Sequence, residues 1–195
     1  MNTTKMDVTG ITTNEVITNI LSRRSVRKFL SVPVEKEKTD LLLRAGMQAP
    51  SAVNKQPWHF VVVDNPAVKQ QIIAKSPNGR TFSTADQLII VCGNLTKKIE
   101  GDGSLFWIID CSAATENILL AAHGLGLGAV WTGAYPFADY CSMLSTVLHL
   151  PEHIMPFAVI AVGYAENERE AKSKWDQKKV SYNTFKYMAE KVVRR

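Results

Sequence analysis

Cysteine is scarce in this sequence, and long apolar runs are missing from it. Its 195 residues include three cysteines, Cys92, Cys111 and Cys141, which is an odd number with no C-x-x-C pair. A disulfide framework or a zinc ribbon is therefore not indicated, and we expect buried thiols. We find no apolar run near the ~20 residues of a membrane span and no leader sequence. A cytoplasmic protein without membrane contact is the expectation.

Internal repeats and low-complexity linkers are also missing, so nothing marks a domain boundary. The 46% of hydrophobic and 21% of charged residues are an ordinary globular balance, sufficient for a core. We predict a flexible N-terminus over residues 1–12, which is polar and lacks periodicity, followed by one domain over residues 13–195.

Acidic residues are in the minority, since 23 Lys and Arg against 18 Asp and Glu give a formal net charge of +5. That balance favours an anionic partner, either a nucleic acid or a smaller cofactor or substrate. The basic residues gather in two short segments, 23–28 and 172–179, and no zinc-finger spacing or aromatic RNA-binding box accompanies them. The distribution favours a small anion over nucleic acid.

Apolar periodicity predicts helices that alternate with a few buried strands. We expect helices at residues 15–22 (after a capping box at 12–15), 35–48, 67–75, 107–123, 138–148 and 182–191. We expect strands at 59–63, 88–91, 130–131 and 157–162, and a loop at 77–79. This order predicts an α+β or α/β layered domain. Segment 165–181 has no apolar face of its own, so we expect it to lie on another surface, for which a partner subunit is a candidate.

The first segment suited to binding follows the first helix and contains Arg23, Arg24, Ser25 and Arg27. Guanidinium groups present planar, forked donors that suit a phosphate, and the serine hydroxyl adds another hydrogen bond. A solvated basic turn is the alternative interpretation.

The second segment, residues 49–58, places Pro50, Ser51, Asn54 and Gln56 in a short loop. Prolines fix the backbone directions, and the hydroxyl and amide groups can match the alternating carbonyls and ring nitrogens of a flavin edge. The alternative is an ordinary helix-to-strand turn whose polar side chains bond their own backbone.

Two further patterns resemble a dinucleotide-binding fingerprint and a zinc motif, but neither matches in full. The glycine-rich run 124–133 lacks the G-x-G-x-x-G fingerprint, because Ala129 and Trp131 occupy positions where glycine is needed. The run also follows a predicted helix, whereas the fingerprint follows a strand. We interpret Gly124 as a helix C-cap. Residues 149–153 fit H-x-x-E-H, but Pro151 opposes the helix that this zinc motif requires. We predict no metal site.

Taken together, these segments resemble the nitroreductase family of flavoproteins. The resemblance rests on segment 23–27, on 49–58 and on the order of 110–122, 124–128 and 131–133, and it extends from about residue 13 to the C-terminus. It implies an α+β fold with a mixed sheet flanked by helices, in an intertwined homodimer with FMN at its interface. Electrons would pass from NAD(P)H through flavin N5 to a nitroaromatic, quinone or similar small acceptor in a ping-pong cycle.

The resemblance also implies roles for individual residues. The phosphate and ribityl ligands would be Arg23, Arg24, Ser25 and Arg27, and the contacts to the ring would be Pro50, Ser51 and Asn54. The backbone N–H that reaches N5 would lie among Trp131, Thr132 and Gly133. A C-terminal basic pair, Lys172 and Lys174, would complete the phosphate site, with Lys179 as a rival. No side chain is expected to act as a catalytic acid, because the flavin carries the redox chemistry.

Two alternatives stay open at this point. A specialised branch of the same family, acting in dehalogenation, flavin destruction or azoline oxidation, would carry the same residues. Outside redox chemistry, the chain could be a basic, non-enzymatic module that binds phosphate or nucleic acid.

Overall fold

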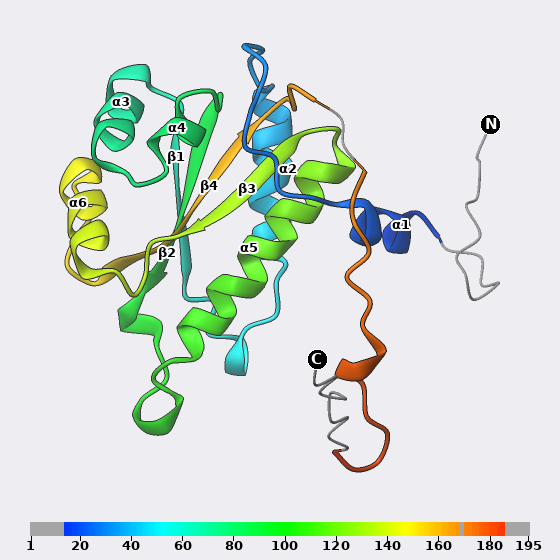
Figure 1. Cartoon of the computed structure of the whole chain (residues 1–195). Coiled ribbons are helices and arrows are strands. Elements are labelled where there is room, and N and C mark those ends of the chain that lie inside the picture. The colour runs from blue at the N-terminus through cyan, green and yellow to red at the C-terminus, as the bar shows by residue number, and fades with distance from the viewer. Residues whose placement is uncertain (1–13, 168–169, 186–195) are drawn as a thin grey trace, which may run out of the picture.

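The computed structural model describes residues 14–167 and 170–185, and its centre is a four-stranded sheet (Figure 1). The strands are β1 (Trp58–Val63), β2 (Gln87–Asn94), β3 (Gly128–Gly133) and β4 (Ile154–Gly163). They lie in the order β1-β2-β4-β3, and each neighbouring pair is antiparallel. A parallel contact is added beside β3, where Ser25 forms an isolated bridge with Ala129. The predicted strands are confirmed, each longer than the apolar run that predicted it.

Helices cover both faces of the sheet (Figure 1). One layer holds α2 (Lys36–Met47) and α5 (Phe106–Gly124), and the other holds α3 (Pro66–Lys75), α4 (Gly79–Phe82) and α6 (Ala138–Leu148). Outside these layers, α1 (Glu15–Ser22) contacts α5, where Asn19 Nδ2 donates to Leu120 O at 2.9 Å. Short 3-10 turns occupy Ala52–Asn54, Leu95–Lys97, Gly101–Gly103 and Gln177–Lys179. The arrangement confirms the predicted α+β class.

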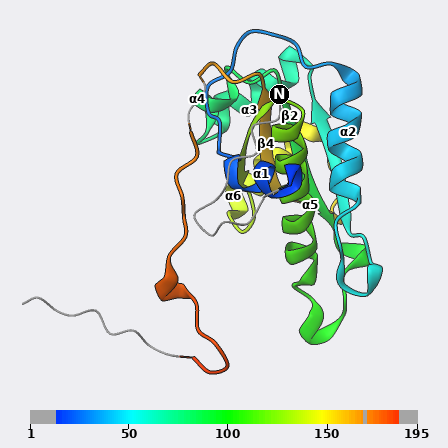
Figure 2. The same ribbon diagram turned by 90° about the vertical axis from the view of Figure 1, so that its right-hand side faces the viewer.

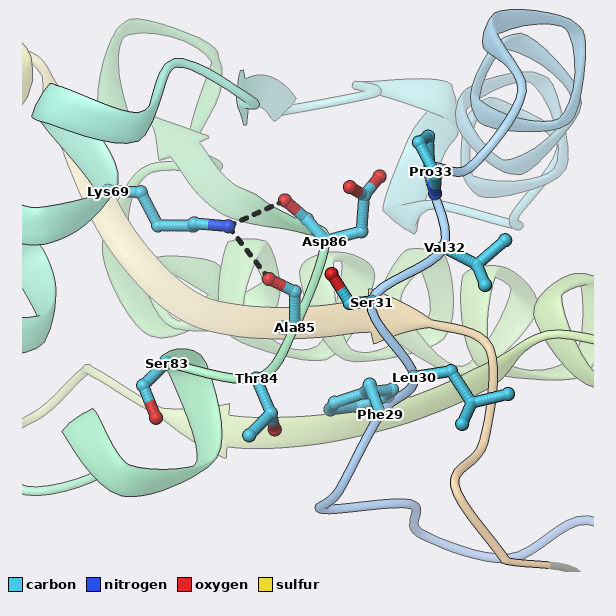
Figure 3. Close-up of a pocket in the computed structure, with 10 residues that line it drawn as sticks. All are labelled: Phe29, Leu30, Ser31, Val32, Pro33, Lys69, Ser83, Thr84, Ala85 and Asp86. Atoms are coloured by element: carbon cyan, nitrogen blue, oxygen red, sulfur yellow. Dashed lines mark hydrogen bonds between the residues drawn. The ribbon is translucent and has the colours of Figure 1, made fainter.

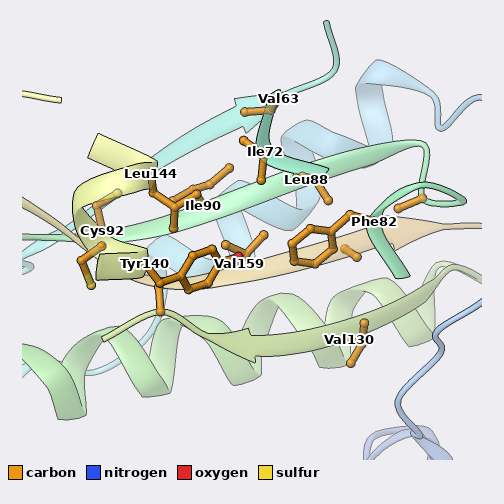
Figure 4. Close-up of a cluster of buried hydrophobic side chains, with 14 of the residues drawn as sticks. Val63, Ile72, Phe82, Leu88, Ile90, Cys92, Val130, Tyr140, Leu144 and Val159 are labelled. Atoms are coloured by element: carbon orange, nitrogen blue, oxygen red, sulfur yellow. The ribbon is translucent and has the colours of Figure 1, made fainter. Parts of the chain in front are cut away.

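The alternation of side chains along β2 explains its unbroken apolar run. Leu88, Ile90 and Cys92 belong to the cluster beneath α3, α4 and α6 (Figure 4). Ile89 and Val91 belong to the cluster on the opposite face, beneath α2 and α5. A strand with a helical layer on each side has no solvent face, which is why periodicity of two is absent from its sequence.

The start of α1 differs in detail from the predicted capping box. Asn14 is the N-cap, and its Oδ1 accepts a hydrogen bond from the Ile17 N–H at 2.9 Å. Asparagine is among the preferred residues at this position. Residues 12 and 13 of the predicted box lie outside the described residues.

The end of α5 corrects a second prediction. The helix runs through Gly124, and the left-handed residue that ends it is Gly126, with φ +75°. Leu127 N–H donates to Ala122 O at 2.8 Å, and Gly126 N–H donates to His123 O at 3.1 Å. This pair of bonds is the Schellman arrangement, in which the glycine follows the C-cap residue.

Helix α5 also overturns the expectation that no apolar run approaches the length of a membrane span. Residues Gly101–Gly124 are long and apolar enough to cross one by length and composition. In the structure, however, α5 packs against α2 and all four strands. Its buried side chains include Cys111, Ile118 and Ala122. A helix covered by neighbours on several sides is apolar around most of its circumference, as a core helix is.

Two other regions differ from the prediction. The loop predicted at 77–79 is present as a turn at Pro77 and Asn78, but Gly79 already begins α4, a short helix that was not predicted and whose Phe82 is fully buried. Of the predicted helix 182–191, residues 182–185 are not helical and residues 186–191 lie outside the described residues. In both places, turn-forming residues and sparse apolar positions left the periodicity too short to interpret.

All three cysteines are buried and unpaired, as predicted. Burial raises the pKa of the Cys92 thiol to about 12 and also raises the pKa values of Cys111 and Cys141. Because the thiolate is the reactive form of cysteine, these groups are chemically inert at neutral pH.

Helix α1 and the C-terminal segment expose large apolar side chains. No residue of α1 is buried, and its exposed apolar residues are Val16, Ile17, Ile20 and Leu21. The segment 170–185 exposes Trp175, Tyr182 and Phe185 and lies away from the sheet in both views (Figures 1 and 2). Large exposed apolar patches are typical of interaction surfaces.

Candidate functional site

The basic segment 23–27 is anchored to the free edge of β3. Val26 N–H donates to Ala129 O at 2.9 Å, and the Val26 side chain is buried against Gly128. A Cβ at Gly128 would lie 2.7 Å from Val26, so the glycine permits this close approach. Side chains alternate along an extended backbone, which leaves Ser25 and Arg27 exposed on the opposite side.

Positive charge gathers where this segment meets α5. Arg23 Nε lies 3.1 Å from Glu116 Oε1, close enough for an ion pair but not aligned as a hydrogen bond. Arg24 Nη2 donates to Asn167 O. Burial, and then the charges of Arg23 and Arg24, lower the pKa of His123. The segment therefore has a surplus of positive charge that an anion would balance.

The loop after α2 holds an unusual backbone. Val53, Asn54 and Gln56 have φ angles of 44°, 55° and 46°, in the left-handed region. Asparagine tolerates this conformation, whereas a β-branched residue is strained in it, at a cost of about 1–3 kcal/mol. Val53 is nevertheless 78% exposed, so packing of its own side chain does not hold it there.

Hydrogen bonds from inside and outside this loop hold it in place. Gln56 N–H donates to Ser51 Oγ at 3.0 Å, and Gln56 Nε2 donates to Asn54 Oδ1 at 2.9 Å. From α5, the carboxylate of Asp110 accepts the Ala52 N–H at 2.9 Å. The bonds within the loop match the alternative of a self-satisfied turn, but the left-handed residues and the carboxylate of a distant helix do not belong to an ordinary turn.

The end of β3 presents backbone groups to its open edge. Thr132 Oγ1 donates to Val159 O at 3.0 Å within the sheet. Backbone groups alternate between the two sides of an antiparallel strand. The Ala129 carbonyl faces outward, where it accepts the Val26 N–H. By this alternation, the N–H groups of Trp131 and Gly133 also point away from β4. In the described part of the chain no strand lies beyond this edge of the sheet.

The basic segment and the 50–56 loop contact α5 at different places. Glu116, which contacts the basic segment, and Asp110, which contacts the 50–56 loop, lie six residues apart on α5. Six residues at about 100° each place these two contacts on helix faces about 120° apart. Lys172 and Lys174 lie on the exposed C-terminal segment, where Lys179 is 3.9 Å from Asp176.

A cavity of about 410 Å³ lies elsewhere, between segment 29–33, Lys69 and segment 83–86 (Figure 3). Lys69 Nζ donates there to Ala85 O at 2.8 Å and Asp86 O at 2.9 Å, while Asp86 Oδ2 accepts the Val34 N–H. Asp86 precedes the first residue of β2, whereas Asn94 at the other end of β2 bonds to Pro57. The cavity is thus remote from the 50–56 loop and contains no predicted site residue.

The segment with the formal zinc motif is not helical. Helix α6 ends at Leu148, and His149 has φ 52°, in the left-handed region. The two histidines therefore do not share a helical face, as the proline argument predicts. Within the described ranges, no group of three or more His, Cys, Asp or Glu side chains could hold a metal ion.

Sequence reasoning gave no role to the charged residues of α5 that contact the two segments. Asp110 is 5% exposed, and Glu116 and His123 are half-buried. The available signal was an acidic residue at a position of the helix that the neighbouring apolar residues mark as inward. The buried carboxylate of Asp110 needs a hydrogen-bond donor, which the Ala52 N–H supplies, and the half-buried Glu116 forms an ion pair with Arg23.

The comparisons with known proteins agree with these features. The family model described as Nitroreductase family matches residues 20–79 and 74–164. The chain belongs to the nitroreductase family. A relative from Methanothermobacter thermautotrophicus, provisionally named NADH dehydrogenase/NAD(P)H nitroreductase, is 46% identical over 155 residues, 78% of this chain and 79% of the relative.

Solved structures support this membership and the fold. A crystal structure from Bacteroides thetaiotaomicron with the same provisional name is 46% identical, with a TM-score of 0.83 over 89% of this chain and 100% of that one. A nitroreductase from Desulfovibrio desulfuricans in complex with FMN is 29% identical, with a TM-score of 0.76 over 90% and 100% of the two chains. The nitroreductase resemblance drawn from the sequence is confirmed.

Proposed function

We propose that this member of the nitroreductase family is an FMN-dependent oxidoreductase that passes electrons from NAD(P)H to nitroaromatic, quinone or similar small acceptors. The observation that carries the proposal is the surplus of positive charge at segment 23–27, anchored beside a strand whose free edge presents backbone donors. FMN, when bound, supplies the hydride and electron transfer chemistry. The chain's own residues bind and orient it.

Arg23, Arg24, Ser25 and Arg27 are proposed to hold the phosphate and ribityl chain. The Ser25 and Arg27 side chains are exposed and make no hydrogen bond or ion pair with another described residue, so their donors are available. Charge-assisted bonds to a phosphate are about twice as strong as neutral ones. Lys172 and Lys174, or Lys179 in their place, add cations from the C-terminal segment.

Pro50, Ser51 and Asn54 are proposed to contact the flavin ring, and the free backbone edge at Trp131, Thr132 and Gly133 to reach flavin N5. The outward N–H of Gly133 is a donor of the kind that N5 requires. No titratable side chain among these residues is suited to be a proton donor. Substrate protons therefore come from solvent or from the cofactor.

We propose that the complete site forms in an intertwined homodimer. The basic segment and the 50–56 loop contact faces of α5 about 120° apart, and α1 and the C-terminal segment carry uncovered apolar side chains. Two copies that exchange these surfaces would cover them and bring the two segments together. Residues 13–195 act as one domain in this proposal, after a flexible 1–12, and the enzyme works in the cytoplasm without nucleic acid or membrane.

The absorption spectrum and the steady-state kinetics test the proposed chemistry. Purified protein should be yellow, with a flavin band at about 450 nm that bleaches on addition of NAD(P)H. If one cleft serves donor and acceptor in turn, initial rates over a grid of both concentrations should give parallel double-reciprocal lines.

Each departure from this result has its own meaning. Intersecting lines would show that both substrates bind together and would overturn the shared cleft. A yellow protein that NAD(P)H does not bleach would favour dehalogenation, flavin destruction or azoline oxidation. A colourless protein that retards DNA would favour the non-enzymatic module.

The oligomeric state tests the dimer. Sedimentation of the wild type should give about twice the 21.6 kDa chain mass. Ile20→Glu, which places a charge on the apolar face of α1, should shift the equilibrium toward monomer and release FMN. Val32→Glu, at an exposed valine outside α1 and the C-terminal segment, is the matched control. A wild-type monomer that binds FMN tightly would contradict the homodimer.

A further inference from the structure

The feature that the proposed function leaves unexplained is a buried carboxylate behind the 50–56 loop. Asp110 lies near the start of α5 and is 5% exposed. Its Oδ1 accepts the Ala52 N–H at 2.9 Å, and this is the hydrogen bond that its side chain makes with the described residues. Burial of a carboxylate is costly, so its position at the base of this loop calls for a reason beyond packing.

The loop that Asp110 holds is the strained one. Ala52, its partner, directly precedes Val53 and Asn54, both left-handed. The two ends of the loop are fixed separately, since α2 ends at Met47 and Pro57 O accepts the Asn94 N–H at 2.6 Å. Between these anchors, the Asp110 bond links α5 to the residue that precedes the left-handed pair.

We propose that Asp110 is a positioning residue for the flavin: its carboxylate fixes Ala52, and through it presents Ser51 and Asn54 to the ring. The proposal rests on the proposed FMN function. It assigns Asp110 two separable effects. The acceptor oxygen sets the loop geometry. The buried carboxylate bonds to Ala52, one residue from Ser51 and two from Asn54, and its negative charge there disfavours the electron-rich reduced flavin.

Two substitutions separate these effects. Asp110→Asn keeps the shape and retains a carbonyl oxygen that can accept the Ala52 N–H, but it removes the charge. Asp110→Ala removes both. Thr115→Val is the matched control, because Thr115 is buried on the same helix and its hydroxyl bonds within that helix, to Cys111 O.

The measurements are FMN affinity, by fluorescence titration of apo-protein, and the midpoint potential of the bound flavin. We expect Asp110→Ala to weaken FMN binding about tenfold or more, as for loss of a charged hydrogen bond. Asp110→Asn should restore most of this affinity and still give a more positive potential than the wild type. Thr115→Val should match the wild type in both. Thermal unfolding of each apo-protein, measured in parallel, identifies any loss of FMN affinity that is caused by unfolding of the variant.

Several outcomes would overturn the assignment. Wild-type affinity in Asp110→Ala would show that the loop does not need the carboxylate, and a wild-type potential in Asp110→Asn would show that its charge does not act on the flavin. A loss of affinity in proportion to the unfolded fraction would make Asp110 purely structural. If wild-type protein itself fails to bind FMN, the proposed function fails instead, which keeps the two hypotheses distinguishable.

Discussion

Arg27→Ala is expected to weaken FMN binding by about 1.5–3 kcal/mol, which is roughly tenfold or more in the dissociation constant. Arg27 is exposed beside the bridge between Ser25 and Ala129, with no ion pair to another described residue, so its charge is available to a phosphate. Titration of apo-protein with FMN measures the effect. Arg23→Ala should produce a loss of similar size, and it also leaves Glu116 without its cation.

Two controls make this result specific. Arg80→Ala removes an exposed arginine from α4, outside the proposed site, and should leave the affinity unchanged. Arg27→Lys keeps the charge but loses the forked donors, so it should lie between the wild type and Arg27→Ala. Unchanged affinity in both Arg23→Ala and Arg27→Ala would remove the segment from the cofactor site.

Phe82→Ala is expected to lower the free energy of unfolding by about 3–5 kcal/mol, as large-to-small changes of buried aromatic residues do. Phe82 is fully buried in the cluster beneath α3, α4 and α6, where it packs among residues such as Leu88 and Val159 (Figure 4). Denaturant unfolding of apo-protein measures the loss without the stabilisation that bound FMN would add.

Phe82→Leu serves as the matched substitution, because it removes less volume and should cost less. The remaining folded Phe82→Ala protein should bind FMN with wild-type affinity, since α4 lies outside the proposed cofactor site. A decrease in unfolding free energy below about 1 kcal/mol for Phe82→Ala would contradict this prediction. It would show that the neighbouring side chains fill the space left by the phenyl ring or tolerate it as a void.

The sequence predicts most of the layered core because the core depends on local periodicity. Ile89 and Ile90 lie on opposite faces of one strand, and both faces are covered, so an unbroken apolar run was the correct signal. Helix α4 was missed because it has four residues and begins at Gly79, directly after turn-forming residues. Gly124 was preferred over Gly126 as the helix end because several glycines in one run leave the left-handed position ambiguous.

The sequence identifies the segments of the candidate site, but not the distant residues of the same chain that contact them. The arginines at 23–27 and the polar loop at 50–56 stand out in the sequence because of their residue types. What fixes them is distant: Glu116 for Arg23 and Asp110 for Ala52, across more than fifty residues in each case. Helical periodicity places Asp110 at an inward position of α5, but it does not show which group across the fold bonds to the carboxylate.

The burial of every cysteine makes the natural chain a ready background for site-directed labelling. Cys92, Cys111 and Cys141 are held as thiols in the core, so a maleimide probe has no competing target on the folded protein. A cysteine introduced at exposed Tyr182 can therefore carry a fluorophore or spin label without prior removal of the native cysteines. Distances from such a label to a second one on α5 would report where the C-terminal segment lies in solution.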